Sequence, residues 1–400
     1  MTAVIQKGHR VLVVLLAALS MLGALCIDAY LPSLPTIARE FGASPAAAQQ
    51  TMTVYLACFA FMMLFYGTLS DSFGRRPVLL ASMWLYVAGA LGAVFAPSLG
   101  WLLFFRAVQG LSAGAGSTVG RAVVGDLLRG AEAQRTMAVI SMVFGIAPAV
   151  APIIGGWLEA ASGWRAVFVF IALCGALLLA ACLRWLPESL PAAERHPFRL
   201  SAILASYREV GTHARFLCKA LGAAFGFSGV MLYVGSAPAF AMGILHLPVT
   251  AFAWLFVPLI GGMTLGSAVA AKLSHRVAPR AMIAAGFAVM AAGAAANVLY
   301  AWLCVSAVPW AVVPLFVYAF GMALGNPAMT LLALDFFPRI RGMAASLQGF
   351  TFMATFAVVS GVVCPLLFGS ALHLALGLAG GLALSVAFWT LGTRVLPKNA

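Results

Sequence analysis

The chain has 400 residues, of which 64% are hydrophobic and only 8% are charged, and its mean hydropathy is +1.05. A soluble domain carries about a quarter charged residues, so this composition excludes a soluble globular protein. The net charge of +13 could indicate a nucleic-acid partner, but the basic residues lie in short segments between apolar runs. That placement is typical of the positive charge that membrane proteins keep on the cytoplasmic side, and we expect no nucleic-acid partner.

Long apolar runs recur from Val11 to Leu391. Each is close to the roughly 20 residues that cross a hydrocarbon core about 30 Å thick. Only helices and closed barrels satisfy the backbone in lipid, and these runs lack the alternation of barrel strands. The sequence therefore predicts an all-α membrane protein with twelve transmembrane helices. The predicted spans are 11–30, 49–69, 77–96, 99–123, 137–158, 165–186, 216–241, 250–271, 281–302, 308–332, 343–365 and 371–393.

The longest polar stretch divides the chain near its middle. We predict an N-terminal six-helix bundle over residues 1–186, a cytoplasmic linker over 187–215 and a C-terminal six-helix bundle over 216–400. The loop Leu69–Arg76 follows the second span and the loop Leu273–Arg280 follows the eighth; both begin with Leu-Ser and end with Arg. Matching loops in corresponding places indicate two pseudo-symmetric halves.

The basic residues also predict the orientation of the chain. With both termini in the cytoplasm, Arg39 and Arg165 lie outside and Arg106 lies within a span, which leaves 20 of the 23 basic residues inside. The positive-inside rule favours this orientation over its reverse. The first apolar run, after Lys7 and Arg10, is longer than the apolar core of a cleaved signal peptide, so we expect it to be retained.

Asp28 is the single residue among the ten acidic residues that lies inside an apolar run. A charge at membrane depth costs about 2.5–3.5 kcal/mol on insertion scales and usually has a function and a partner. A carboxyl group there can bind and release a proton. The alternative is that Asp28 only reaches the outer interface, because we expect Pro32 and Pro35 to end the helix just beyond it.

Arg106 is the matching basic residue within a span. It lies about seven residues from the outer end of its span, or roughly 10 Å at 1.5 Å per residue, and Asp28 lies roughly 5 Å from the end of its own. These depths make an ion pair between Asp28 and Arg106 feasible. The alternative for Arg106 is a structural hydrogen-bonding centre.

Small residues and prolines recur along several spans. Small residues at four-residue spacing let helices approach closely. These rows are Gly110/Gly114, Gly116/Gly120, Ala147/Ala151/Gly155, Gly262/Gly266/Ala270 and Gly321/Gly325. Prolines bend helices or loosen their hydrogen-bond ladders, and we expect interruptions at Pro148, Pro152, Pro238, Pro258, Pro314 and Pro327. Together these features favour helices that move, with static packing as the alternative.

Catalytic and metal-binding patterns are missing from the sequence. The seven cysteines lie singly in apolar segments without metal-ligand spacing, and the histidines lie in loops or near span ends. No acids, histidines or cysteines gather at membrane depth. We therefore expect a transporter that is not an enzyme, with no metal and no cofactor; a membrane-embedded enzyme or a sensor is the alternative from another class.

The segment Gly67–Pro77 reads G-T-L-S-D-S-F-G-R-R-P. It resembles the loop between spans 2 and 3 of the major facilitator superfamily, G-x-L-x-D-R-x-G-R-R, with Ser72 in place of the usual Arg. The resemblance implies a gate in which Arg75 pairs with Asp126 and Asp71 approaches the N-terminus of the eleventh span, where a helix dipole favours an anion. The implied gate residues are Gly67, Asp71, Gly74, Arg75, Arg76 and Asp126.

Further segments resemble the superfamily's twelve-span drug:proton antiporters of the bicyclomycin-resistance type. Arg106–Gly110 is similar to the motif R-x-x-Q-G, whose Arg is linked to proton coupling, and Asp28–Pro35 resembles D-M-Y-L-P-x-x-P. Ala147–Gly156 resembles the antiporter motif G-x-x-x-G-P-x-x-G-G, with Ala at both early glycines. The implied antiporter-motif residues are Pro148, Ala151, Pro152, Gly155 and Gly156.

The resemblance implies two six-helix bundles around a central cavity whose access alternates. We expect Asp28 and Arg106 to carry proton coupling: protonation of Asp28 from outside would release its pairing with Arg106 and favour release of the drug. The candidate substrate-cavity residues are Tyr30, Tyr55, Asn297 and Asn326.

The expected partners are a small, largely apolar drug-like substrate, protons and membrane lipid. The proton gradient would be the energy source. We expect a monomer in the bacterial inner membrane with both termini cytoplasmic. An importer or exporter of an endogenous metabolite with the same fold remains the alternative function.

Overall fold

The computed structural model describes residues 2–395, and it describes side chains for residues 11–201 and 203–393. The chain forms two compact units, residues 1–203 and 204–400. The boundary falls within the predicted linker, at α10 (Leu200–Gly211). Over the described residues the regular structure is all helical, which confirms the predicted fold class.

The first unit begins with one long, interrupted span. α1 (Thr2–Asp28) is followed by the short turn η1 (Leu31–Ser33) and by α2 (Leu34–Glu40). α1 thus ends at Asp28, just before Pro32, as predicted, but the chain resumes helical turns at once. Both prolines occupy the first positions of the next helical turns, where the missing N–H costs no intrahelical bond. The apolar span accordingly continues to Glu40.

The remaining helices of the first unit follow the predicted spans with two breaks. They are α3 (Pro45–Met63), α4 (Tyr66–Phe73), α5 (Arg75–Val94), α6 (Leu99–Ala113), α7 (Ala115–Leu127), α8 (Gly130–Ser162), α9 (Trp164–Trp185) and η2 (Ala192–Glu194). The predicted span 49–69 is bent by 50° between α3 and α4. The predicted span 99–123 is divided at Gly114 into α6 and α7.

The second unit repeats this pattern of long apolar helices. It contains α11 (Ala214–Gly235), η3 (Ala239–Ile244), α12 (Ala253–Leu273), α13 (Pro279–Leu303), α14 (Val313–Leu334), α15 (Arg341–Val358), η4 (Val359–Val363), α16 (Cys364–Leu367), α17 (Ala371–Thr390) and η5 (Leu391–Val395). Within the described residues ten helices could cross a membrane by length and composition, or eleven with the bent pair α3 and α4. The divided pair α6 and α7 covers the one other predicted span.

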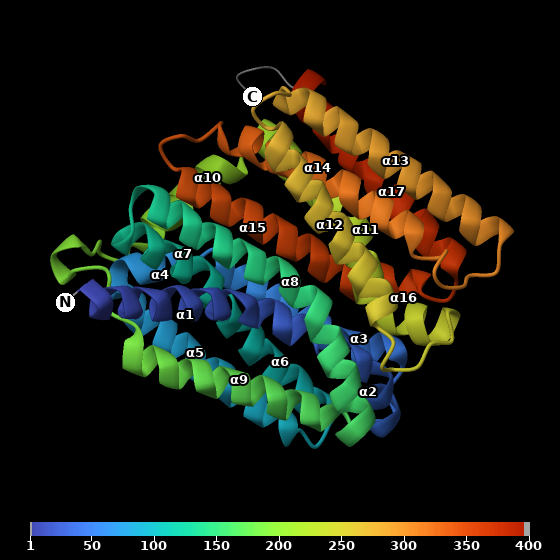
Figure 1. The fold of residues 1–400 in the computed structure, drawn as a ribbon, viewed down its shortest axis with the longest axis horizontal. Helices are drawn as coiled ribbons and strands as arrows, with labels where there is room; N and C mark the ends of the chain where they lie inside the picture. The colour runs from blue at the N-terminus through green and yellow to red at the C-terminus, as the bar shows by residue number, and fades with distance from the viewer. Residues whose placement is uncertain (1, 396–400) are drawn as a thin grey trace. The chain divides into compact units, whose positions relative to one another are not determined.

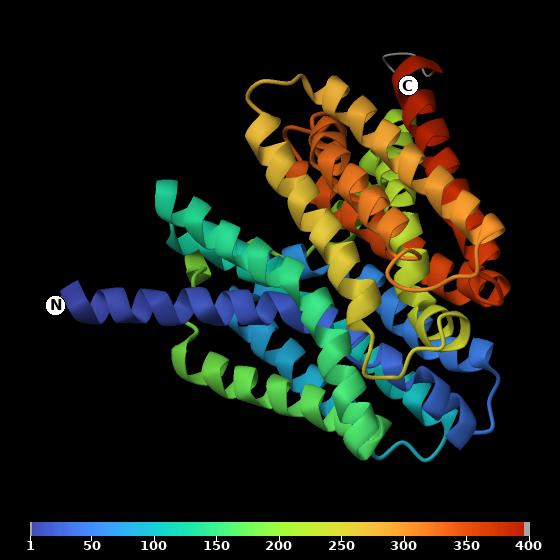
Figure 2. The same cartoon turned by 45° about the vertical axis from the view of Figure 1, so that its right-hand side comes forward.

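Helix packing within each unit determines which side chains meet. In the first unit α1 packs against α7 and α8, α3 against α6, and α5 against α6 and α9 (Figure 1). In the second unit α14 packs against α12 and α13, and α17 packs against α11 and α13 (Figure 2). The row Gly262/Gly266 lies against the backbone of Phe316 and Phe320, which confirms close approach at this predicted small-residue row.

Four of the six prolines that we expected to interrupt helices lie within continuous helices. α8 runs through Pro148 and Pro152, and α12 and α14 run through Pro258 and Pro327. Pro314 lies in the first turn of α14, where a proline is tolerated. Pro238 directly precedes the π-helical turn η3, so it is the one proline of this set that stands at a helix break.

Candidate functional site

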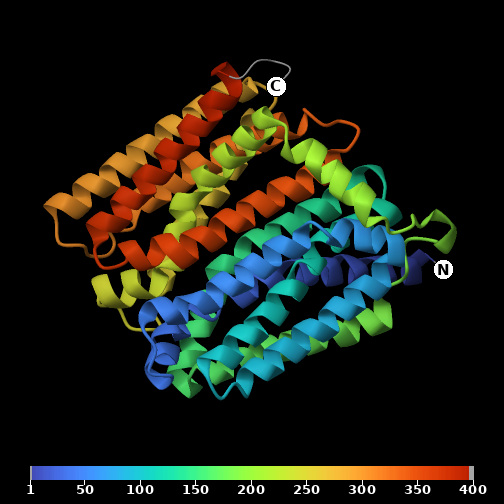
Figure 3. The same cartoon turned by 180° about the vertical axis from the view of Figure 1, so that it is seen from behind.

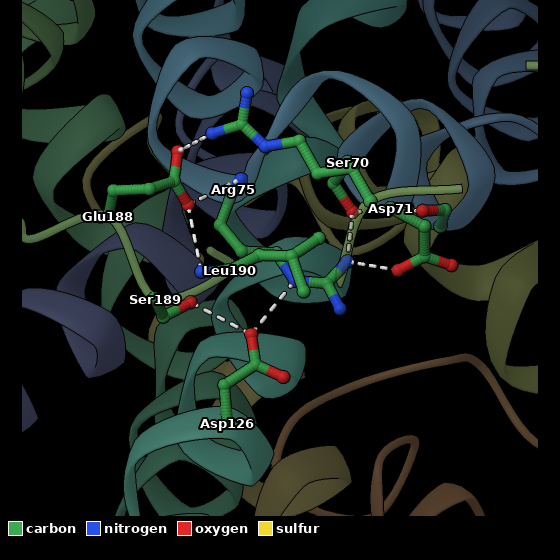
Figure 4. Close-up of polar contacts among 9 residues, drawn as sticks. Ser70, Asp71, Arg75, Asp126, Glu188, Ser189 and Leu190 are labelled. Carbon is green, nitrogen blue, oxygen red and sulfur yellow. Dashed lines mark hydrogen bonds and ion pairs between the residues drawn. The ribbon is translucent and has the colours of Figure 1, made fainter. Parts of the chain in front are cut away.

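Two polar clusters lie in the first unit. The first, which we call the Arg75 cluster, consists of Ser70, Asp71, Arg75 and Asp126 (Figure 4). Arg75 opens α5 and its side chain is 9% exposed. Its Nε donates to Oδ2 of Asp126 at 3.0 Å, and its Nη1 donates to Oγ of Ser70 at 2.7 Å and also to Asp71. The structure thus contains the predicted Arg75–Asp126 ion pair.

The glycines and the second arginine of this motif differ in their surroundings. Gly74 has a φ of +100°, a backbone conformation that favours glycine, and a Cβ built there would displace the carboxylate of Glu188, whose Oε2 would lie 2.5 Å away. Gly67 has open space around it, and the structure offers no steric reason for glycine there. Arg76 donates from Nη2 to the Leu183 carbonyl at 3.0 Å. The expected approach of Asp71 to the eleventh span involves both units and stays a prediction.

The second group, the Arg106 cluster, surrounds a fully buried guanidinium. Arg106 Nη1 donates to Oε1 of Gln109 at 3.0 Å and to Sγ of Cys26 at 3.1 Å, and Nε donates to the Thr51 carbonyl at 3.3 Å. The guanidinium carbon lies 4.5 Å from the ring centre of Tyr30 and 4.3 Å from that of Tyr55. Two tyrosine faces and these acceptors hold the cation in a site sealed from solvent.

No ion pair joins Asp28 to Arg106, although both side chains are among those described. The predicted pairing is therefore wrong for this structure. Cys26 contacts Arg106, and Asp28 follows it by two residues on α1, which rotates its side chain by about 200° around the helix axis. Sequence depth alone could not show this difference in helical phase.

Asp28 lies instead on the part of α1 that meets α8. Its residue is 4% exposed, and no other acidic residue among the described side chains is buried to this degree. The span continues to Glu40, twelve residues or up to about 18 Å of helical rise away. Asp28 therefore lies farther from the end of its apolar span than the sequence predicted.

The antiporter-like motif of α8 contacts α1 beside Asp28. A Cβ at Gly155 would lie 1.7 Å from the Ala29 carbonyl oxygen, so only glycine permits this approach. Ala151, Pro152 and Gly156 are buried on the same helix, whereas Pro148 is partly exposed. One turn beyond Gly155, Glu159 accepts a hydrogen bond from Ser33 at 2.5 Å.

The four predicted cavity residues are divided between the units. Tyr30 and Tyr55 are fully buried against Arg106; the Tyr30 hydroxyl contacts Thr51, and the Tyr55 hydroxyl donates to the Gly23 carbonyl at 3.0 Å. In the second unit Asn297 is buried and donates to the Tyr233 hydroxyl at 2.8 Å. Asn326 is partly exposed. Their role in binding a substrate stays a prediction.

Sequence reasoning missed several partners in both clusters. Thr51, Gln109 and Cys26 contact Arg106, and Glu188 and Ser189 contact the Arg75 cluster. Gln109 could have been found, since it lies within the R-x-x-Q-G motif three residues from Arg106 and on the same helix face. The others lie on segments distant in sequence. Within the described residues, no group of three or more His, Cys, Asp or Glu could hold a metal ion.

A model of the Major Facilitator Superfamily matches residues 15–362 of this chain. The chain belongs to this superfamily. It is accordingly a multi-pass membrane protein and a secondary transporter, and not an enzyme, which confirms those predictions.

Individual relatives agree with the membership. A bicyclomycin resistance protein homolog of Haemophilus influenzae is 29% identical over 98% of this chain and 99% of its own length. Multidrug resistance protein D of Escherichia coli is 28% identical over 84% of each chain. The crystal structure of a D-xylose-proton symporter has a TM-score of 0.74 at 16% identity, covering 98% of this chain and 97% of its own, which shows the fold alone. The resemblance predicted from the motifs is thus confirmed.

Proposed function

We propose that this transporter exports small, largely apolar organic molecules in exchange for protons. The names of its relatives, which refer to bicyclomycin and multidrug resistance, support the substrate class. We place it in the bacterial inner membrane as a monomer with both termini in the cytoplasm, on the basis of the positive-inside rule. The proton gradient is its energy source, and it needs no cofactor.

The observation that carries the proposal is the position of Asp28. A buried carboxyl group in a transmembrane helix is an expensive feature that usually has a function. Asp28 adjoins the Ala29 carbonyl against which Gly155 packs, so a change of charge at Asp28 acts beside a close contact between the end of α1 and α8. Proton binding at Asp28 can therefore favour one packing of these helices over another.

Arg106 enters this proposal as a fixed partner of α1 rather than as the counter-ion of Asp28. Its contact with Cys26 ties it to the opposite face of the same helix. Among the described residues, Arg106 Nη2 and Gln109 Nε2 are buried donors without a protein acceptor. The cluster can therefore donate a hydrogen bond to a further acceptor when α1 moves. Proton and substrate then compete through one conformational equilibrium, which is the requirement for coupled exchange.

The Arg75 cluster has the role of a gate in this proposal. Its buried arginine holds α4, α5 and α7 together through Asp71 and Asp126. Breaking the ion pairs of Arg75 leaves its charge poorly solvated, which costs free energy. The cluster therefore stabilises one arrangement of these helix ends and gives way in the other during alternating access.

Everted membrane vesicles with an acidic interior test the proposal. Addition of an exported drug should release protons from the vesicles, seen as recovery of a pH-sensitive dye's fluorescence in vesicles with the transporter and not in vesicles without it. The panel should include chloramphenicol-like compounds and cationic dyes. Transport that survives complete collapse of the proton gradient would contradict proton coupling.

The alternative is an importer or exporter of an endogenous metabolite. Intact cells distinguish it, because a drug exporter lowers accumulation of the drug and an importer concentrates its substrate. A folded protein that moves no member of the drug panel but accumulates a metabolite would favour this alternative.

A further inference from the structure

The segment between α9 and α10 contacts the Arg75 cluster directly. This segment, residues 188–198, lies within the predicted linker and carries the acidic residue Glu188. Oε1 of Glu188 accepts the backbone N–H of Arg75 at 3.0 Å and that of Leu190 at 3.1 Å (Figure 4). Figure 3 shows this stretch, in light green, passing the blue ends of α4 and α5.

Glu188 supplies the N-terminal cap that α5 lacks. The residue at the N-cap position is Gly74, which has no side chain to accept from the first N–H groups of the helix. Those groups need an acceptor, and the positive end of the helix dipole favours a carboxylate. Glu188, 113 residues away in sequence, fills this place. The absent Cβ of Gly74 gives it room, because a Cβ would lie 2.5 Å from Glu188 Oε2.

The same segment also contacts both acids of the cluster. Ser189 Oγ donates to Asp126 Oδ2 at 2.8 Å, the oxygen that also accepts Arg75 Nε at 3.0 Å. The backbone N–H of His196 donates to the Asp71 carbonyl at 3.2 Å. Within the segment, Arg195 and Glu188 form an ion pair of 3.4 Å, which joins its first residue to a residue near its end. Arg75, Asp126 and Asp71 are therefore each contacted from the 188–198 segment.

We propose that Glu188 and Ser189 are positioning residues of the gate, and that Arg75 and Asp126 separate only when the 188–198 segment detaches. Arg75 and Ser189 both donate to Oδ2 of Asp126, and the backbone N–H of Arg75 donates to Glu188. Separation of Arg75 from Asp126 and detachment of the segment therefore occur together. The segment is followed by α10, which leads into the second unit. Attachment of the segment therefore couples the chain connection between the units to the gate. The inference rests on the transporter function but not on proton coupling or on the identity of the substrate.

The first test is limited trypsin cleavage after the exposed Arg199 in purified protein, without drug or proton gradient. Glu188→Ala should raise the cleavage rate about tenfold, because a hydrogen-bonded charge is lost at the attachment. Glu188→Gln keeps an acceptor and should give a smaller increase. Glu209→Ala, at an exposed position of α10, is the matched control and should be cleaved like wild type. Wild-type cleavage of Glu188→Ala would overturn the proposal.

The second test asks whether the segment and the gate act together. In a double-mutant cycle on the same cleavage rate, Asp126→Asn and Glu188→Ala should be strongly non-additive, because each releases the shared attachment. A merely structural role of Glu188 would give additive effects. Additive effects in folded variants would overturn the proposal even if drug transport proceeds as proposed, and absence of drug transport would leave this readout unaffected.

Discussion

Gly155 of α8 packs against the backbone of Ala29, which directly follows Asp28, the last residue of α1. A Cβ at position 155 would lie 1.7 Å from the Ala29 carbonyl oxygen, far inside van der Waals contact. The antiporter-like motif and the buried carboxyl group, which are distant in sequence, thus meet at one helix crossing. The close contact at this crossing explains why the motif has glycine at position 155.

We predict that Gly155→Ala separates α1 from α8 and reduces drug export at least tenfold. Overpacking of a close contact costs about 1–3 kcal/mol or more, so the purified protein should also melt at a lower temperature. Gly145→Ala on the same helix is the control, because no atom lies within 4 Å of a Cβ there. Equal export by the two variants would show that the close approach is dispensable.

Arg106→Lys should reduce transport at least tenfold while retaining the positive charge. A lysine cannot donate to Thr51, Cys26 and Gln109 together, and it stacks less well between Tyr30 and Tyr55 than the planar guanidinium. Drug export in cells, normalised to protein in the membrane, measures the effect. Arg121→Lys on α7, where the side chain is exposed, should export normally. Full activity of Arg106→Lys would mean that charge alone suffices.

Gly110→Ala on α6 should disturb the Arg106 cluster by pushing away Tyr55 of α3. A Cβ at Gly110 would lie 2.3 Å from the Tyr55 carbonyl oxygen, whereas one at Gly100 on the same helix meets only Ser98 Oγ at 3.8 Å. We therefore expect Gly110→Ala to lower the melting temperature and the export rate, and Gly100→Ala to leave both near wild type. Matching melting curves for the two variants would contradict the observed α3–α6 packing.

Asp126→Asn should weaken the gate by removing the ion pair with the buried Arg75. Asp71 and Ser70 remain as partners, so we expect a loss of about 1–3 kcal/mol in stability rather than unfolding. Thermal unfolding in detergent measures it. The control is Asp335→Asn, which removes a more exposed acid whose pair with Arg341 spans 3.8 Å; its effect should be within about 0.5 kcal/mol. A larger loss for Asp335→Asn would contradict this ranking.

The sequence predicted the fold class and the Arg75–Asp126 pair, because hydropathy and motif spacing report on helices and on short segments. It also placed Asp28 and Arg106 within apolar spans, and both are buried; their roles stay predictions. It did not predict how helices rotate against each other. Depth counting therefore paired Asp28 with Arg106, although Cys26 faces the arginine. Glu188 was missed for a related reason: a cap supplied from 113 residues away has no local sequence signal.

Proline rules were also incomplete guides to this chain. Pro32 and Pro35 begin new helical turns and so extend the first span to Glu40. Pro148 and Pro152 remain within a continuous α8, because neighbouring helices and local adjustments can satisfy the freed backbone groups of a transmembrane helix. Local preference thus predicted the end of α1 before Pro32, but not the continuation of the span to Glu40 or of α8 through its two prolines.

The central claim is that Asp28 binds the proton that is exchanged for the drug. Its most direct test is proton release from purified transporter in weakly buffered detergent solution, followed with a pH indicator after addition of a drug shown to bind. Wild type and Asp28→Glu should release protons on binding, whereas Asp28→Asn should bind the drug without release. Equal proton release by wild type and a folded, drug-binding Asp28→Asn variant would contradict the claim.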